Sequence, residues 1–199
     1  MTRTLSFFLL ALLLASSTHY AGAGQTGESR KVPYDKVAPE DDKSRAESAR
    51  SAAEQGSASA QYNLGLMYRK GTGVRQDDKK AVAWYEKAAA QGHVKAQANL
   101  GFMYENGYGA RKDGGKAVEM YRRAAAQGLA VAQFNLAVHY SKGDSAPHDD
   151  VRAYAWFSLA VENGYTDARE HLQNVGKRLT PEQKAEARKL ARQLAGPKR

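Results

Sequence analysis

The stretch of sequence that decides the fold occurs three times, at residues 60–92, 96–128 and 132–164. The first copy reads AQYNLGLMYRKGTGVRQDDKKAVAWYEKAAAQG and the second reads AQANLGFMYENGYGARKDGGKAVEMYRRAAAQG. The third is more divergent and reads AQFNLAVHYSKGDSAPHDDVRAYAWFSLAVENG. Glycines recur every 36 residues, at Gly56, Gly92, Gly128 and Gly164. Agreement of so many positions at one offset indicates an internal structural repeat.

Each copy predicts two helices. The first helix places apolar residues on one face, at Ala60, Leu64, Met67 and Tyr68. The second does the same at Ala81, Trp84, Tyr85 and Ala88. Around Asp77 a carboxylate can cap the second helix, and Gly92 suits its C-terminal end. The loop between the helices holds Gly-x-Gly in two copies, whereas residues 143–148 read GDSAPH, so we expect this third loop to differ in shape.

The pattern closely resembles the Sel1-like repeats, which are relatives of the tetratricopeptide repeats. The family pattern is matched by Ala60, Leu64-Gly65, Tyr68, Gly71-x-Gly73, Asp77, Lys80-Ala81, Trp84-Tyr85, Ala88-Ala89 and Gly92. The third copy departs from it with Ala137 in place of Gly65 and Gly101. The resemblance covers about residues 43–176. It implies an all-α fold, an α-solenoid of antiparallel helix pairs typically used for protein–protein contacts.

The repeat register divides the chain into consecutive segments. We predict a signal peptide at 1–23, a flexible lead at 24–40, an N-terminal capping helix at 41–56, repeats at 57–92, 93–128 and 129–164, a partial repeat at 165–176, and a basic C-terminal helix and tail at 177–199. Thr180, Pro181 and Gln183 form a strong start signal for this last helix. Its apolar stripe is Ala187, Leu190, Ala191 and Leu194.

The first residues have the features of an export signal. Arg3 precedes an apolar run from Leu5 to Ala15, and Ala21-Gly22-Ala23 satisfies the small-x-small rule for cleavage. The apolar run would be roughly 16 Å long as a helix, too short to cross a hydrocarbon core of ~30 Å. We expect an exported periplasmic or secreted chain cleaved near Ala23, with a retained membrane anchor as the alternative. The chain has no cysteine, which excludes disulfides and a lipid-modified cysteine.

Motifs for catalysis are missing from the sequence. It contains no Gly-x-Ser-x-Gly, Ser-x-x-Lys, His-Glu-x-x-His, Walker loop or EF-hand loop. The five histidines fall in different structural positions without metal-ligand spacing. We therefore expect no catalytic residue, cofactor or metal site. Some exported, cysteine-rich relatives are linked to penicillin binding or hydrolysis, and a hydrolase of this type is an alternative; the absence of cysteine and of Ser-x-x-Lys argues against it.

Recognition through the first helices is the leading hypothesis. In such solenoids the first helices tend to line the concave face, and their non-core positions vary from repeat to repeat. The candidate partner-binding residues are Tyr62, Leu66, Arg69, Phe102, Glu105, Phe134, Val138 and His139. For an aromatic residue or methionine at helical spacing, a place in the core is the competing interpretation. Two polar positions recur unchanged, at Gln61, Gln97 and Gln133 and at Asn63, Asn99 and Asn135. We expect both to bond a neighbouring helix rather than a ligand.

The net charge of +9 comes mostly from the C-terminal end. Among the 199 residues, 30 are Lys or Arg and 21 are Asp or Glu, and residues 177–199 hold eight basic and two acidic ones. The candidate patch for an anionic partner is Lys177, Arg178, Arg188, Lys189 and Arg192. It could dock on an acidic protein or anionic cell-envelope material, or simply be the solvated side of a terminal helix. Aromatic residues do not interleave with it, so nucleic acid is a poor candidate partner.

These observations favour a non-enzymatic adaptor or regulator that binds another envelope or secreted protein. An envelope-binding module acting through the basic C-terminal helix is the other alternative.

Overall fold

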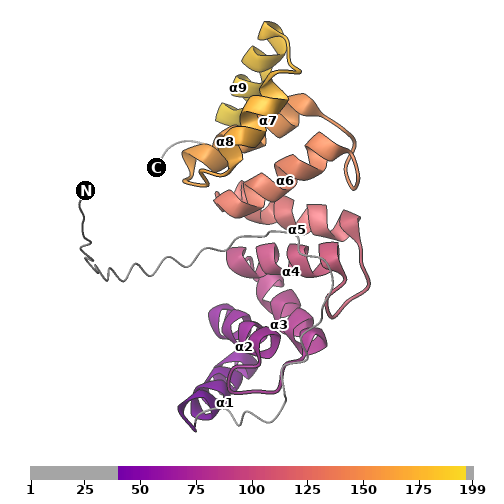
Figure 1. Cartoon of the computed structure of the whole chain (residues 1–199). Coiled ribbons are helices and arrows are strands. Elements are labelled where there is room, and N and C mark those ends of the chain that lie inside the picture. The colour runs from indigo at the N-terminus through magenta and orange to yellow at the C-terminus, as the bar shows by residue number, and fades with distance from the viewer. Residues whose placement is uncertain (1–39, 196–199) are drawn as a thin grey trace, which may run out of the picture. The chain divides into compact units, whose positions relative to one another are not determined.

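The computed structural model describes residues 40–195, and all regular structure in this range is helical (Figure 1). The helices are α1 (Glu40–Glu54), α2 (Ala58–Lys70), α3 (Asp78–Ala90), α4 (Val94–Asn106), α5 (Gly114–Ala126), α6 (Ala130–Lys142), α7 (Asp150–Glu162), α8 (Ala168–Gly176) and α9 (Pro181–Ala195). The predicted all-α solenoid is confirmed. The predicted signal peptide and nearly all of the predicted lead lie outside the described residues.

Consecutive helices pack against one another along the chain. Contacts join α1 to α2, α2 to α3, and so on to α7, and both α8 and α9 then pack on α7. The first helices of the three repeats are α2, α4 and α6, and the second helices are α3, α5 and α7. Each repeat therefore contacts mainly its sequence neighbours, as in other solenoids.

Short capping motifs fix where the helices begin and end. Asp77, Asp113 and Asp149 each accept a hydrogen bond from the backbone N–H three residues later, at 2.8–3.0 Å. Each first helix of a repeat ends at a glycine in the left-handed conformation, with φ of 72–74° at Gly71, Gly107 and Gly143. These positions explain the repeated aspartate and glycine, because other residues cap or adopt a positive φ less readily.

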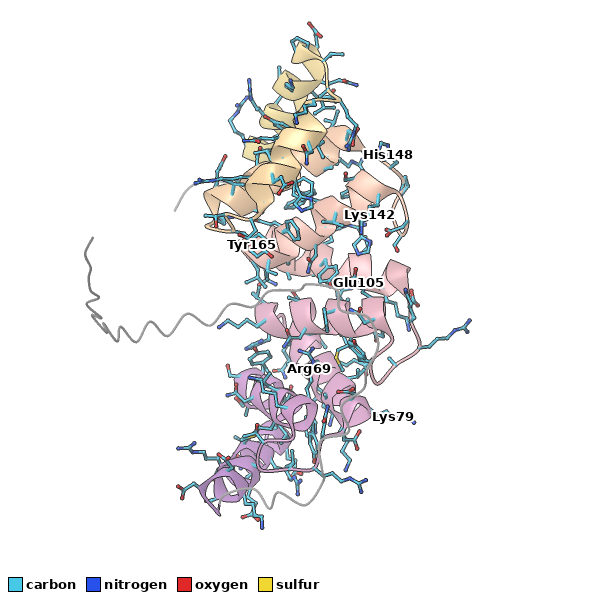
Figure 2. The ribbon with its side chains drawn as sticks, viewed as in Figure 1. Arg69, Lys79, Glu105, Lys142, His148 and Tyr165 are labelled. Atoms are coloured by element: carbon cyan, nitrogen blue, oxygen red, sulfur yellow. The ribbon has the colours of Figure 1, made fainter. Side chains whose placement is uncertain are left out.

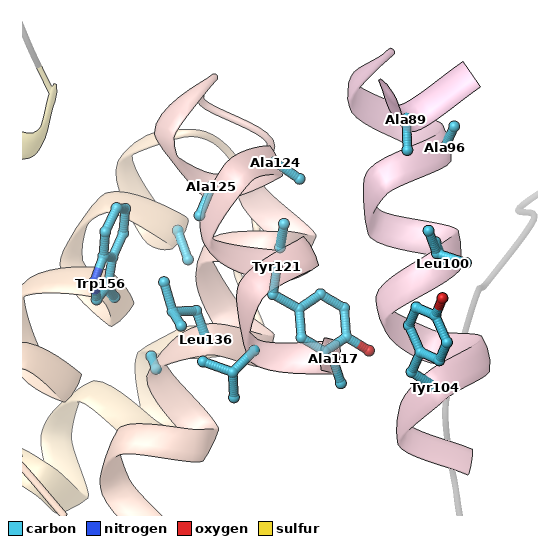
Figure 3. Close-up of a cluster of buried hydrophobic side chains, with 14 of the residues drawn as sticks. Ala89, Ala96, Leu100, Tyr104, Ala117, Tyr121, Ala124, Ala125, Leu136 and Trp156 are labelled. Atoms are coloured by element: carbon cyan, nitrogen blue, oxygen red, sulfur yellow. The ribbon is translucent and has the colours of Figure 1, made fainter. Parts of the chain in front are cut away.

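The core repeats with the sequence. Leu64, Leu100 and Leu136 are fully or almost fully buried, and so are the ring residues Tyr85, Tyr121 and Phe157. Figure 3 shows Tyr121 on α5 projecting toward α4, which carries Leu100 and Tyr104. The two helices can approach closely because α4 has Gly101 opposite the ring: a Cβ there would lie 2.8 Å from the Tyr121 Cε1.

The loop of the third repeat keeps one hydrogen bond of the other two loops and lacks another. Thr72 and Tyr108 donate their backbone N–H groups to the carbonyls of Met67 and Met103, and Asp144 makes no equivalent bond to a described residue. The backbone N–H of Asp149 donates to the Tyr140 carbonyl at 2.9 Å, as Asp77 and Asp113 do to the equivalent tyrosines. In repeat 2, a Cβ on Gly109 would collide with the backbone carbonyl of Asp78. In repeat 3 the same position is Ser145, and the residue that it meets is Gly114 instead of an aspartate. Because Gly114 of repeat 2 has no side chain, there is room for the side chain of Ser145 in repeat 3.

The two ends of the stack are polar helices. In α1 only Ala46 and Ala53 are buried, and in α9 only Ala187 and Ala191 are. The predicted start of α9 is confirmed: the Thr180 N–H donates to Gln183 Oε1 at 2.9 Å, and the Gln183 N–H donates to Thr180 Oγ1 at 3.3 Å. This reciprocal pair satisfies two otherwise free backbone and side-chain groups. Within the described range, no helix is both long and apolar enough to cross a bilayer.

Candidate functional site

A network of buried amides joins successive repeats. Gln61, Gln97 and Gln133 are at most 5 % exposed, and each donates to a carbonyl of the preceding helix, at Ala53, Ala89 and Ala125, over 3.1–3.3 Å. Each also accepts a hydrogen bond from an amide at the end of the following second helix, at Gln91, Gln127 and Asn163, over 2.7–2.9 Å. The expected contact of these glutamines with a neighbouring helix is confirmed, and it assigns them to repeat stacking.

The recurring asparagines behave differently, and the expectation for them is wrong. Asn63 is exposed, and Asn99 and Asn135 are half-buried. None of the three amides makes a hydrogen bond with another described residue, although their glutamine neighbours two positions earlier are fully used. Residues two positions apart on a helix point in different directions. The glutamine side chains therefore reach the preceding helix, whereas the asparagine side chains border solvent. Their polar groups are therefore at least partly accessible on the first helices.

Seven of the eight candidate partner-binding residues are half-buried on these same helices. They are Tyr62, Leu66 and Arg69 on α2, Phe102 and Glu105 on α4, and Phe134 and Val138 on α6. Arg69 places its guanidinium carbon 4.8 Å from the centre of the Phe102 ring, a cation–π contact between repeats 1 and 2. Figure 2 shows Arg69, Glu105 and Lys142 at successive levels, one from each first helix. We call the accessible side of α2, α4 and α6 the first-helix face.

The aromatic members of the set also support the packing. The Tyr62 ring stacks on His93 with centroids 4.6 Å apart, and Phe134 lies 4.8 Å from the Tyr165 ring and 5.6 Å from Phe157. Both interpretations of these aromatics therefore hold in part: one side of each ring is packed and the rest is accessible.

His139 does not lie on the accessible surface, which corrects its place in the predicted set. It is 4 % exposed, and it stands at the position that Met67 and Met103 hold in the other repeats. Its Nδ1 lies 2.9 Å from Asp144 Oδ1, and its Nε2 lies 3.7 Å from Glu105 Oε1. The other Glu105 oxygen accepts a hydrogen bond from the Tyr121 hydroxyl at 2.7 Å. The ring thus links two repeats through carboxylates rather than reaching a partner.

Asp144 and Tyr104 have shifted pKa values. Burial alone would raise the pKa of Asp144, but the hydrogen bond and charge of His139, together with Lys142, outweigh burial and lower this pKa. Burial and the 2.7 Å hydrogen bond to Glu86 raise the pKa of Tyr104 to about 12. Both shifts favour the protonation states that these groups already have at neutral pH, so they describe structural contacts.

Tyr108 is an accessible aromatic that the sequence analysis did not single out. It is 46 % exposed, and its ring lies 5.8 Å from that of Phe102. It occupies the variable middle position of the Gly-x-Gly loop, where repeats 1 and 3 have Thr72 and Asp144. The variation of this one position between otherwise similar loops could have identified Tyr108 from the sequence. Tyr108 extends the first-helix face toward the loop edge.

The basic residues near the C-terminal end are not equivalent. All five residues of the predicted patch are exposed. Arg178, however, forms a two-point ion pair with Asp150, with Nε 2.7 Å from Oδ2, and its Nη2 donates to Ser141 at 3.1 Å. Arg178 therefore fastens the start of the C-terminal segment to repeat 3, which removes it from the patch. The remaining members, Lys177, Arg188, Lys189 and Arg192, form no ion pair with a described residue. No cluster of three or more His, Asp or Glu suited to a metal ion occurs within residues 40–195.

Comparison with known proteins agrees with this geometry. The Sel1 repeat family matches three consecutive segments, residues 58–93, 94–129 and 130–165, which together span more than half of the chain. The chain belongs to the Sel1 repeat family. The predicted resemblance is confirmed, with repeat boundaries one residue later than those taken from the sequence. Sel1 repeats typically mediate protein–protein interactions.

Two solved structures share the fold. A Sel1 repeat protein from Oxalobacter formigenes is 37% identical over 66% of this chain and 54% of its own, with a TM-score of 0.63. The protective antigen c5321 of uropathogenic Escherichia coli strains, which displays an SLR fold, is 32% identical over 74% of this chain and 33% of its own, with a TM-score of 0.65. This Sel1 repeat chain thus spans about half of the first protein and a third of the second. No curated protein matches the chain.

Proposed function

We propose that this Sel1 repeat protein is an exported, non-enzymatic adaptor or regulator that binds another protein of the cell envelope, or a secreted one, through its first-helix face. The signal-like start of the sequence supports export. The family supports a protein partner.

The observation that carries the proposal is the contrast between two sets of polar residues on the same helices. The side-chain amides of the repeated glutamines are hydrogen-bonded between stacked helices. Those of the repeated asparagines are accessible and form no hydrogen bond with a described residue. Asparagine is a poor residue for the middle of a helix unless its amide has a use. Beside the asparagines, the half-buried side chains change from repeat to repeat, as at Leu66, Phe102 and Val138. Constant amides next to variable apolar groups suit recognition of one particular protein segment.

A crosslinked pull-down from envelope extract of the native organism tests the proposal. Val138→Glu places a charge on the first-helix face, and Met120→Glu is the matched control, because both residues are half-buried and pack on the core but Met120 lies on the second helix α5. We expect the wild type and Met120→Glu to recover the same discrete protein and Val138→Glu to lose it. Circular dichroism of both variants establishes that each remains folded. Equal recovery by all three proteins would contradict binding through the first-helix face.

A second candidate function is binding of anionic envelope material through the C-terminal helix. It is favoured by the exposed side chains of Lys177, Arg188, Lys189 and Arg192, which have no acidic partner among the described residues. Replacing Arg188, Lys189 and Arg192 by Gln should abolish co-sedimentation with purified cell wall, and salt should weaken the co-sedimentation of the wild type. Unchanged sedimentation of the triple variant would rule this function out.

A further inference from the structure

A cavity of about 720 Å³ lies at the edge of the stack, where the loop of repeat 1 joins α2 to α3. Figure 2 shows Lys79, which lines this cavity, on the same edge as His148 in the loop of repeat 3. The cavity contains no member of the predicted partner-binding set, so it is separate from the first-helix face. Its charged lining residues are Arg50, Arg75, Lys79, Lys80, Asp77 and Asp78.

Tyr68 brings a buried hydroxyl group to this cavity. The residue is only 7 % exposed, and its hydroxyl oxygen accepts a hydrogen bond from Arg50 Nη2 at 3.0 Å. The hydroxyl hydrogen has no acceptor among the described residues. Since a buried donor without an acceptor is unfavourable, the hydroxyl group suits a ligand atom that accepts a hydrogen bond.

The equivalent tyrosine of repeat 2 has its acceptor within the protein. Glu86 stands one repeat after Arg50, and its Oε1 accepts a hydrogen bond from the Tyr104 hydroxyl at 2.7 Å. Arginine at this position in repeat 1 therefore leaves the Tyr68 donor open and replaces a negative charge by a positive one. In repeat 3 the equivalent Arg122 is already in an ion pair within its own helix.

Positive charge surrounds the open donor. The Lys80 Nζ lies 5.3 Å from the centre of the Tyr68 ring and 3.8 Å from Asp77 Oδ2. Asp77 also caps α3, so this carboxylate is engaged twice. Arg50 and Lys79 are exposed and form no ion pair with a described residue. With four basic residues against two acidic ones, the lining favours an anion.

The other repeats do not reproduce this set of cations. Gly115 in repeat 2 and Val151 in repeat 3 stand where Lys79 stands in repeat 1. Pro147 in repeat 3 stands where Arg75 does. A property common to the whole stack would recur with the 36-residue spacing, whereas this combination belongs to one repeat and indicates a single site.

The arrangement of the donors suits a phosphate group better than a carboxylate. Arg50 comes from α1, Tyr68 from α2, and Lys79 and Lys80 from α3. Donors from three helices match the oxygens of a tetrahedral phosphate, whereas a carboxylate presents two oxygens in one plane. Arginine can also bond two phosphate oxygens at once. The volume lies in the range of small-molecule sites, which leaves room for the group that carries the phosphate.

We propose that this cavity binds a phosphate monoester, carried either by a small soluble molecule or by a lipid headgroup. Arg50 and Lys79 make charge-assisted hydrogen bonds to the phosphate, and the Tyr68 hydroxyl donates to a further oxygen. The site is additional to the protein-binding surface and does not rest on the proposed function.

Nuclear magnetic resonance of the isotope-labelled protein tests the site with three probes of similar size. These are glycerol 3-phosphate, glycerate, which carries a carboxylate instead, and uncharged glycerol. We expect glycerol 3-phosphate to shift the signals of Arg50, Tyr68 and Lys79, with about tenfold tighter binding than glycerate and no response to glycerol. Equal binding of the phosphate and the carboxylate would overturn the assignment to a phosphate.

Matched variants localise the response. Arg50→Glu installs the residue of repeat 2, which gives Tyr68 an acceptor as Glu86 does for Tyr104, and should abolish phosphate binding. Tyr68→Phe removes the open donor and should weaken binding about fivefold. Arg188→Glu makes the same charge reversal on α9 and should leave binding unchanged. Equal losses in Arg50→Glu and Arg188→Glu would show general charge attraction and refute the site.

Vesicles distinguish the two sources of the phosphate. They consist of phosphatidylcholine with either phosphatidic acid, a phosphate monoester, or phosphatidylglycerol, a diester. Retention on phosphatidic acid vesicles that Arg50→Glu loses and Arg188→Glu keeps would assign the site to a lipid headgroup. Binding of glycerol 3-phosphate without such retention would assign it to a soluble molecule. If neither result is obtained, the proposal is refuted.

Discussion

Replacing Gly101 by alanine tests the close approach on which the stacking of the repeats depends. In a free helix this change is stabilising by about 1 kcal/mol, because alanine has the higher helix propensity. Here the added Cβ would lie 2.8 Å from Cε1 and 2.9 Å from Cδ1 of Tyr121, closer than carbon atoms pack. The ring cannot easily retreat, since Tyr121 is fully buried and its hydroxyl bonds Glu105 at 2.7 Å.

The balance of these two effects gives the size and sign of the expected change. Overpacking in a well-filled core is destabilising by about 1–3 kcal/mol, which exceeds the propensity gain. We therefore expect Gly101→Ala to lower the free energy of unfolding by roughly 1 kcal/mol, a fall of about 2–4 °C in Tm for a domain of this size. Urea and thermal unfolding followed by circular dichroism measure both quantities.

Gly115→Ala is the matched control. Gly115 is also helical, but a Cβ there would meet only Asp113 Oδ1 at 3.4 Å, so the same substitution should be neutral or stabilising by up to about 1 kcal/mol. Repeat 3 combines Ala137 with Phe157 in place of Tyr, which suggests that Tyr121→Phe, by freeing the ring, should recover part of the loss in Gly101→Ala. If Gly101→Ala were as stable as Gly115→Ala, the packing argument would be refuted.

Three further changes probe the core, the amide network and the C-terminal attachment. Leu100→Ala should lower the free energy of unfolding by about 2–5 kcal/mol, because Leu100 is 3 % exposed; an unchanged urea midpoint would contradict the repeat register. Gln97→Ala should lower it by about 1–3 kcal/mol through loss of the buried bond to Ala89, and a change below 0.5 kcal/mol in the same assay would remove the network from the stacking account. The hydrogen bond from Arg178 lowers the pKa of Asp150 against the opposing effect of burial, so this contact stabilises the fold above pH 3.8 and is lost as the pH falls through the folded-state pKa. Asp150→Asn should therefore be less stable than wild type at pH 7 and approach it in acid; a difference independent of pH would contradict the ion pair.

Much of the fold could be predicted because each repeat carries its own local signals. Gly71 caps the end of α2 and Asp77 caps the start of α3, and equivalent residues recur every 36 positions. The helix pairs therefore follow from interactions between residues close together in the sequence. The packing of the third loop against its neighbour could not be predicted in the same way. Ser145 fits only because Gly114, far away in the sequence, has no side chain. The sequence of the loop alone does not show which residue of the neighbouring repeat it contacts.

The site was harder to predict than the fold. Gln97 and Asn99 both recur in every repeat and are two positions apart on one helix, yet one is buried in the stack and the other borders solvent. Recurrence alone does not distinguish them, because the direction of a side chain depends on how the preceding repeat packs. His139 and Arg178 were placed on surfaces for the same reason: their partners Asp144 and Asp150 become visible only in three dimensions.

Site-specific photocrosslinking in cells of the native organism tests the central claim most directly. A photoreactive residue would replace Leu66 on the first-helix face or, in a second protein, Arg122 on the exposed side of α5. The account predicts one discrete crosslinked protein partner from position 66 and none from position 122. Crosslinking from position 122 without any from position 66 would contradict recognition through the first-helix face.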